Sequence, residues 1–120
     1  MHLELAAVPV EHLVSEHVPS TENSAAVAAR VAAARRAQMQ RQGKLNARLT
    51  VAEFAHFCRL DRDSRALVGT AIARLGLSAR AFHRVLKLAR SCADLAAVPH
   101  VRRIDVSEAV NLRVLDRVAR

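Results

Sequence analysis

Residues 78–97 carry the strongest periodic pattern in the chain, and that pattern predicts an amphipathic α-helix. Apolar side chains recur at the three- and four-residue spacing of one helix face: Phe82, Val85, Leu86, Ala89, Cys92, Ala93 and Ala96. Polar residues line the other side, with His83 and Arg90 at its margins: Arg80, Arg84, Lys87 and Ser91. Ser78 is a natural N-cap, because its hydroxyl can accept a hydrogen bond from a first-turn N–H. A helix of this kind needs other elements to cover its apolar face.

The rest of the chain favours helices as well. Alanine supplies 24 of the 120 residues, and only three Gly and three Pro are available for tight turns. Alanine has the best helix propensity and lets helix backbones approach each other closely. We therefore predict one all-α domain, a bundle of about four helices that follows a long leading helix.

The leading helix is expected to be only partly covered. Residues 20–24 supply several candidate N-caps, and the helix runs to about Gln42 and is closed by Gly43. Its apolar side is thin and consists of Val27, Ala28, Val31 and Ala34. Such a helix either bridges two domains or subunits, as in a non-enzymatic adaptor, or forms a basic, solvated surface.

Capping signals delimit two further helices before residue 78. Thr50 with Glu53 forms a capping box that opens a short helix ending at about Cys58. Asp61 caps a helix over residues 62–75. Gly69 lies inside that helix, where glycine costs about 1 kcal/mol relative to alanine, so we expect a close backbone contact there.

The two ends of the chain have different residue patterns. At the C-terminal end, residues 101–104 are predicted to be extended, and Asp105 with Glu108 is predicted to start a last helix that runs to about Asp116. At the N-terminal end, residues 2–5 alternate polar and apolar, which predicts a short strand with no second strand to pair with. We therefore divide the chain into residues 1–18, the remnant of a larger domain, and a helical domain over residues 19–120.

The sequence contains no catalytic or metal-binding motif. It has no GxxxxGK[ST] phosphate loop, no G-x-S-x-G and no H-E-x-x-H. Cys58 and Cys92 each lie on an apolar stripe, which predicts buried, reduced thiols rather than a disulfide or a metal site. No His lies at a ligand spacing from another ligand residue, and we assign no metal. The isolated chain is expected to be catalytically inert.

The net charge of +8 makes an acidic partner plausible, whether nucleic acid, a nucleotide phosphate or an acidic face of another domain. A plain basic surface remains the alternative. The sequence shows no signal peptide and no apolar run of the roughly 20 residues that span a bilayer, which predicts a cytoplasmic protein without a membrane partner.

Arg80 is the candidate functional residue on the predicted 78–97 helix. A cation gains nothing from the helix dipole in the first turn, which is easier to explain if an anion lies nearby. One interpretation is a nucleotide phosphate. Another is a helix-turn-helix formed with residues 64–75, in which Arg80, His83, Arg84 and Lys87 read DNA. The spacing alone favours a purely structural bundle over both, because helix–turn–helix pairs are common in bundles.

Three stretches resemble one family: RQGKLNARL (41–49), RLGLSARAFHRVLKLARSCADL (74–95) and IDVSEAVNLRVLD (104–116). Together they look like the C-terminal part of bacterial Mg-chelatase-like AAA+ ATPases, the ComM/YifB group. The opening HLEL, followed by VP, resembles the end of the AAA+ core of that family.

The resemblance implies a helical lid that packs over a nucleotide bound by a preceding α/β core. In such lids an Arg within an S-x-R pattern acts as the sensor-2 residue and reaches the nucleotide phosphates. Ser78-Ala79-Arg80 matches this pattern, so Arg80 is the nucleotide-binding candidate, and Arg84, one turn further on, is the second.

The resemblance also implies a parent ATPase that uses ATP and Mg²⁺, forms rings with neighbouring subunits and acts on DNA, the ComM type being associated with branch migration in natural transformation. This chain contains neither Walker A nor Walker B. We therefore expect no enzyme activity and no cofactor for the chain by itself, and its nearest partner to be its own AAA+ core. Chelation of Mg²⁺ into porphyrin, the activity that names relatives, has no support in these residues.

Overall fold

The computed structural model describes Ala7, Val10 and residues 22–114, with side chains up to Leu112. Within these residues the regular structure is helical, which confirms the predicted all-α bundle: α2 (Ser24–Gln42), the 3₁₀ turn η1 (Asn46–Arg48), α3 (Val51–Phe57), α4 (Arg62–Leu75), α5 (Ala79–Leu95) and α6 (Arg103–Val114). An isolated bridge joins Leu60 to Val101. The strand predicted at residues 2–5 lies outside the described residues. In the part that is described, no helix combines the length and apolar character needed to cross a bilayer.

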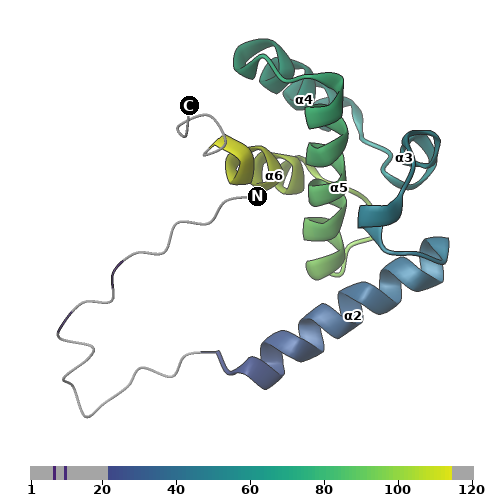
Figure 1. Ribbon diagram of the computed structural model, residues 1–120, viewed down its shortest axis with the longest axis vertical. Helices are drawn as coiled ribbons and strands as arrows, with labels where there is room; N and C mark the ends of the chain where they lie inside the picture. The colour runs from purple at the N-terminus through teal and green to yellow at the C-terminus, as the bar shows by residue number, and fades with distance from the viewer. Residues whose placement is uncertain (1–6, 8–9, 11–21, 115–120) are drawn as a thin grey trace.

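Helix α5 is the centre of the arrangement (Figure 1). Helix α6 packs along one side of it, α3 and η1 lie on the other, and α2 reaches its C-terminal part. Helix α4 makes its main contact with α6. The predicted apolar face of residues 78–97 is therefore the face around which the other helices gather.

The main core lies between α4, α5 and α6. Its buried members are mostly small: Val68, Val85, Ala89, Ala93, Val101, Val106 and Ala109. Ala89, Ala93 and Ala109 are completely buried. Because these side chains are short, the backbones of α5 and α6 can approach closely, which is the packing that the alanine-rich composition predicts.

A second, smaller core joins α3 to α5. Leu49, Phe54, Cys58 and Leu86 are its buried members. Both cysteines are free, Cys58 buried and Cys92 half-buried. Burial raises the pKa of each thiol to about 11, so both stay protonated at neutral pH. Cys58 is therefore buried as predicted, whereas Cys92 is only half-buried.

The capping residues begin and end the helices as predicted. Asn23 accepts a hydrogen bond from the N–H of Ala26 at the start of α2, and Gly43 ends that helix in the left-handed conformation. At the start of α3, Glu53 accepts the backbone N–H of Thr50 at 2.7 Å. Asp61 caps α4 as Asn23 caps α2, because its side chain accepts the N–H of Ser64 at 2.7 Å.

Helix α2 is the least covered helix of the bundle. Ala34 and Gln38 are its buried residues, and both lie in its second half. Val27 and Val31 are 38% and 43% exposed. Figure 1 shows the first half of α2 projecting away from the other helices. The expectation of a partly covered helix is confirmed.

The start of α6 differs from the prediction. Residues 101–104 are not all extended, because α6 begins at Arg103, and Asp105 lies in its first turn rather than before it. Asp105 accepts the backbone N–H of Arg102 at 2.8 Å, which is the reach-back of a third helical residue to the residue before the helix. The predicted pairing of Asp105 with Glu108 as a capping box was therefore wrong.

Two small residues lie at the surface where the sequence predicted packing. Gly69 is exposed, and a Cβ added there would meet no atom within 4 Å, so the close backbone contact is absent. Ala96, assigned to the apolar face of α5, is exposed at the end of that helix. Gly69 therefore only weakens α4 and does not serve packing.

Candidate functional site

The start of α5 presents a free cation to the surface. The Ser78 hydroxyl accepts the N–H of Ala81 at 3.2 Å and caps the helix, which places Arg80 in the first turn. That turn contains no acidic residue. The Arg80 side chain is exposed, and none of residues 22–112 forms a hydrogen bond or ion pair with its guanidinium. The partial positive charge of the helix N-terminus and the charge of the guanidinium therefore lie close together.

Arg84 follows one turn later on the same face of α5. Its side chain is also exposed, and it lines a surface hollow of about 360 Å³ together with Ala47, Lys87, Leu88 and Ser91. The structure thus places both predicted nucleotide-binding residues on one outward-facing stripe, with Arg80 at its N-terminal end.

The other polar residues of the predicted stripe are engaged inside the molecule. The Lys87 ammonium donates to the carbonyl of Ala47 at 2.8 Å and lies 5.3 Å from the centre of the Phe54 ring. The Ser91 hydroxyl donates to the Lys87 carbonyl at 2.9 Å. His83 stacks on Phe54 with ring centres 5.5 Å apart. Of the four residues proposed to read DNA, two are therefore committed to intramolecular contacts, and the helix-turn-helix interpretation stays a prediction.

Arg90, which the sequence placed at the margin of the polar face, is instead buried. Its side chain is 2% exposed and that of Asp94 is 1% exposed. The Arg90 Nη2 atom lies 2.9 Å from Asp94 Oδ1, and the guanidinium also donates to the carbonyls of Val98 and Pro99 at 2.9 Å each. Arg90 therefore holds the loop after α5 against the helix.

The Asp94 carboxylate also accepts two hydrogen bonds from α2. Arg41 donates to its two carboxylate oxygens at 2.6 and 3.1 Å, the bidentate geometry that guanidinium favours. Asn46 of η1 donates to the same carboxylate at 2.8 Å, and the Asn46 N–H donates to Gln38 of α2 at 3.0 Å. The Asp94 network, defined as Gln38, Arg41, Asn46, Arg90 and Asp94, thus ties α2 and η1 to α5.

The electrostatics of the Asp94 network favour the ionised carboxylate. Burial disfavours the charge of Asp94, but hydrogen bonds from Arg41 and Asn46 and the nearby charge of Arg90 outweigh burial and lower the pKa below its ordinary value. Sequence reasoning missed this network. The sequence offered two signals: the i,i+4 spacing of Arg90 and Asp94, and Arg41 with Asn46 in the stretch RQGKLNARL. The pairing of Arg41 with Asp94 spans 53 residues, however, and follows only from the fold.

The exposed stripe of α5 can bind an anion but offers no reaction chemistry of its own. Among the described residues, no group of three or more His, Cys, Asp or Glu side chains could hold a metal ion. Arg80 fits a phosphate, because a guanidinium stays charged and can donate two parallel hydrogen bonds to phosphate oxygens. The stripe provides no carboxylate that would bind Mg²⁺.

Comparison of the sequence with those of known proteins matches the chain to one family. The family model for the C-terminal part of magnesium chelatase subunit ChlI matches residues 21–113. The chain is 44% identical over 112 residues to YifB of Escherichia coli K12 and 40% identical over 111 residues to YifB of Salmonella typhimurium LT2, covering 92% of this chain in each case. It is 37% identical over 97 residues to the competence protein ComM of Haemophilus influenzae, covering 81% of this chain.

The chain spans about a fifth of the length of these relatives, 22% of either YifB protein and 19% of ComM. The family match covers all five described α-helices, from α2 to α6, apart from the last residue of α6. The chain therefore belongs to the Mg-chelatase-like ATPases of the ComM/YifB group and corresponds to their C-terminal helical lid domain.

Proposed function

We propose that this chain is the nucleotide-sensing lid of its parent ATPase and that Arg80 is the residue that contacts the nucleotide. The observation that carries the proposal is the free Arg80 guanidinium in the first turn of α5, with the Ser78 cap beneath it and no acidic residue beside it. A cation held at the positive end of a helix is an unfavourable arrangement by itself. A bound phosphate would offset this cost, because the anion attracts both the guanidinium and the positive end of the helix.

The proposed role is electrostatic. ATP with Mg²⁺, bound by the parent's core, supplies the reactive triphosphate. Arg80 then orients and stabilises its terminal negative charge, and Arg84 adds a weaker contact from the next turn. Because Arg80 is fixed to α5, any movement of the bundle relative to the core would make or break this contact.

The relationship to competence protein ComM supports a wider proposal for the parent. We infer a cytoplasmic, ring-forming motor that remodels DNA by branch migration during natural transformation, with the lid touching its own core and a neighbouring subunit. The basic charge of the chain is compatible with DNA nearby.

The proposal is tested with Arg80→Ala in the full-length parent. Losing one charge-assisted contact costs roughly 1.5–3 kcal/mol, so ATP turnover should fall roughly tenfold to a hundredfold. Arg74→Ala, which removes an exposed Arg at the end of α4, is the matched control and should leave turnover unchanged. Circular dichroism of both variants should show an intact lid. Normal turnover by Arg80→Ala would remove Arg80 from the role.

A further inference from the structure

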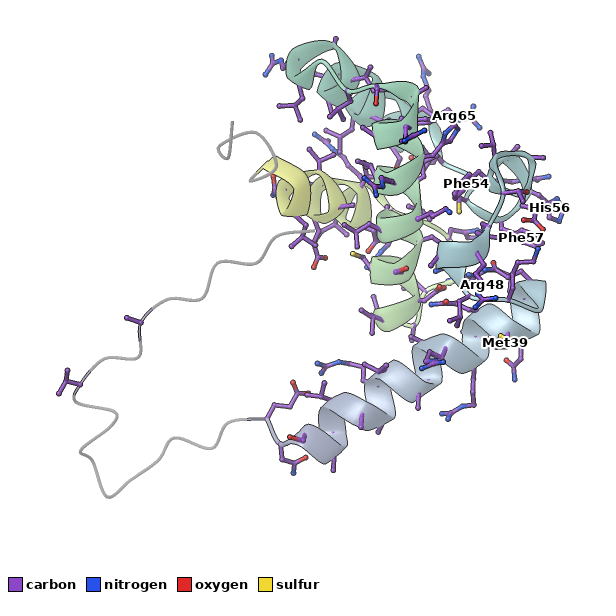
Figure 2. The ribbon with its side chains drawn as sticks, in the orientation of Figure 1. Met39, Arg48, Phe54, His56, Phe57 and Arg65 are labelled. Atoms are coloured by element: carbon purple, nitrogen blue, oxygen red, sulfur yellow. The ribbon has the colours of Figure 1, made fainter. Side chains whose placement is uncertain are left out.

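An apolar hollow lies between α3 and α5, and neither Arg80 nor Arg84 lines it. It has a volume of about 430 Å³, within the range of roughly 300–1,000 Å³ that is usual for binding pockets. Its lining is Val51, Phe54, Ala55, Cys58, Arg59, Leu60, Arg65, Phe82, His83 and Leu86, called the α3–α5 groove from here on. In Figure 2 Phe54 lies on the side of α3 that faces α5, whereas His56 lies on the far side.

The α3–α5 groove has the form of a helix-binding groove. Val51, Phe54, Ala55 and Cys58 follow the i, i+3, i+4, i+7 spacing of one helix face, and all four line the groove. Val51 is 63% exposed and Ala55 is exposed, so the apolar row continues from the buried floor to the open lip. Apolar rows on two neighbouring helices, with a gap between them, are what an amphipathic helix fills with its own i, i+3, i+4 side chains.

The charged side chains that line the α3–α5 groove are both cationic, although Asp61 lies near Arg65. Arg59 and Arg65 line it, both are exposed, and no described residue accepts a hydrogen bond from either guanidinium. No carboxylate is among the lining residues. An occupant that fits therefore carries acidic side chains along the edges of its apolar row.

Two other occupants fit less well. A single-stranded nucleic acid would stack its bases on an aromatic face, but the Phe54 ring is already covered by His83 and by the Lys87 ammonium. A second copy of this chain would bring a like net charge of +8 against the same cations. We propose that the α3–α5 groove is a docking site for an acidic amphipathic helix of a partner protein.

The test is a titration of the ¹⁵N-labelled chain with a synthetic helical peptide of about 15 residues, with Leu at i, i+3, i+4 and i+7 and Glu along both edges. The amide signals of Val51, Ala55 and Leu86 should shift. The same peptide with Lys in place of each Glu should bind at least roughly tenfold more weakly, because the cationic edge then repels it.

Variants of the chain separate groove binding from general attraction to a basic protein. Ala55→Glu places a carboxylate in the lip and should weaken the Glu peptide at least roughly tenfold, whereas Ala52→Glu, on an exposed position of α3 outside the groove, should not. The double variant Arg59→Glu/Arg65→Glu should reverse the preference between the two peptides. Arg35→Glu/Arg36→Glu changes net charge equally on α2 and should leave the preference as it is.

Several results would overturn the proposal. These are no binding of the Glu peptide, equal binding by Ala55→Glu and Ala52→Glu, or shifts gathered around Arg80 and Arg84 instead. Groove signals that shift with protein concentration alone would assign the surface to self-association, and shifts caused by duplex DNA would assign it to nucleic acid. None of these outcomes depends on the ATPase role of Arg80.

Discussion

Replacing Asp94 by alanine should destabilise this domain far more than replacing an exposed charged residue. Asp94→Ala removes the acceptor for Arg41, Asn46 and Arg90 at once. Arg41 is 23% exposed and can turn to water, but Arg90 is 2% exposed and cannot. The variant therefore leaves a buried, uncompensated cation.

The magnitude follows from that burial. Breaking a buried ion pair by removing one partner costs about 3–5 kcal/mol, a large part of the roughly 5–15 kcal/mol that holds a typical domain together. We expect the free energy of unfolding, measured by urea denaturation with circular dichroism, to fall by about that amount without a change in slope.

Glu22→Ala is the matched control, because Glu22 forms an ion pair with Arg30 in which both side chains are about half exposed. An exposed pair is worth about 0–1 kcal/mol, so the control should unfold almost like the unchanged protein. If Asp94→Ala costs no more than Glu22→Ala, the Asp94 network does not stabilise the fold and the reasoning from burial is refuted.

Three further outcomes follow from the same contacts. Because the folded-state pKa of Asp94 is lowered, its stabilisation should be complete above the unfolded pKa of about 3.9 and be lost as pH falls through the lower folded-state pKa. Acid titrations should show a larger loss of stability for the unchanged protein than for Asp94→Ala, which keeps only the losses from other carboxylates with lowered pKa values, such as Asp61 and Asp105. Ala97 has a φ of 55°, so Ala97→Gly should raise the free energy of unfolding by about 1 kcal/mol, whereas Ala96→Gly, at a φ of −80°, should lower it. The Cys58 thiol, with its pKa raised to about 11, should react with a thiol reagent at pH 8 at least roughly a hundredfold more slowly in the folded chain than in urea, and equal rates would contradict its burial.

Local signals explain why most helices could be predicted. Asn23, Thr50, Asp61 and Ser78 act within three residues of themselves, so their capping roles follow from the sequence alone. Asp105 misled the prediction because an Asp can serve either as the N-cap or as the third helical residue, and the sequence does not distinguish the two.

The candidate site likewise has a part that the sequence predicts and a part that only the fold explains. The position of Arg80 in a first turn follows from the local cap at Ser78, and its exposure follows from the apolar period of α5. Arg90 has the same chemistry and lies on the same helix, yet it is buried. Its guanidinium donates hydrogen bonds to Asp94 and to the carbonyls of Val98 and Pro99, which compensate for the burial. Those partners come from α5 and from the loop after it, and Arg41, which also binds Asp94, comes from α2; only the folded chain brings these three segments together.

The way α2 is attached sets a lower limit on the size of this fold. Residues 24–31 contribute no buried side chain, whereas Ala34, Gln38 and Arg41 hold the second half of the helix to α5. Of the described residues, 22–31 could thus be removed without opening either core. The remaining 11 residues of α2 would be too short to stay helical by themselves, so their helical shape would depend on the burial of Ala34 and on the Asp94 network.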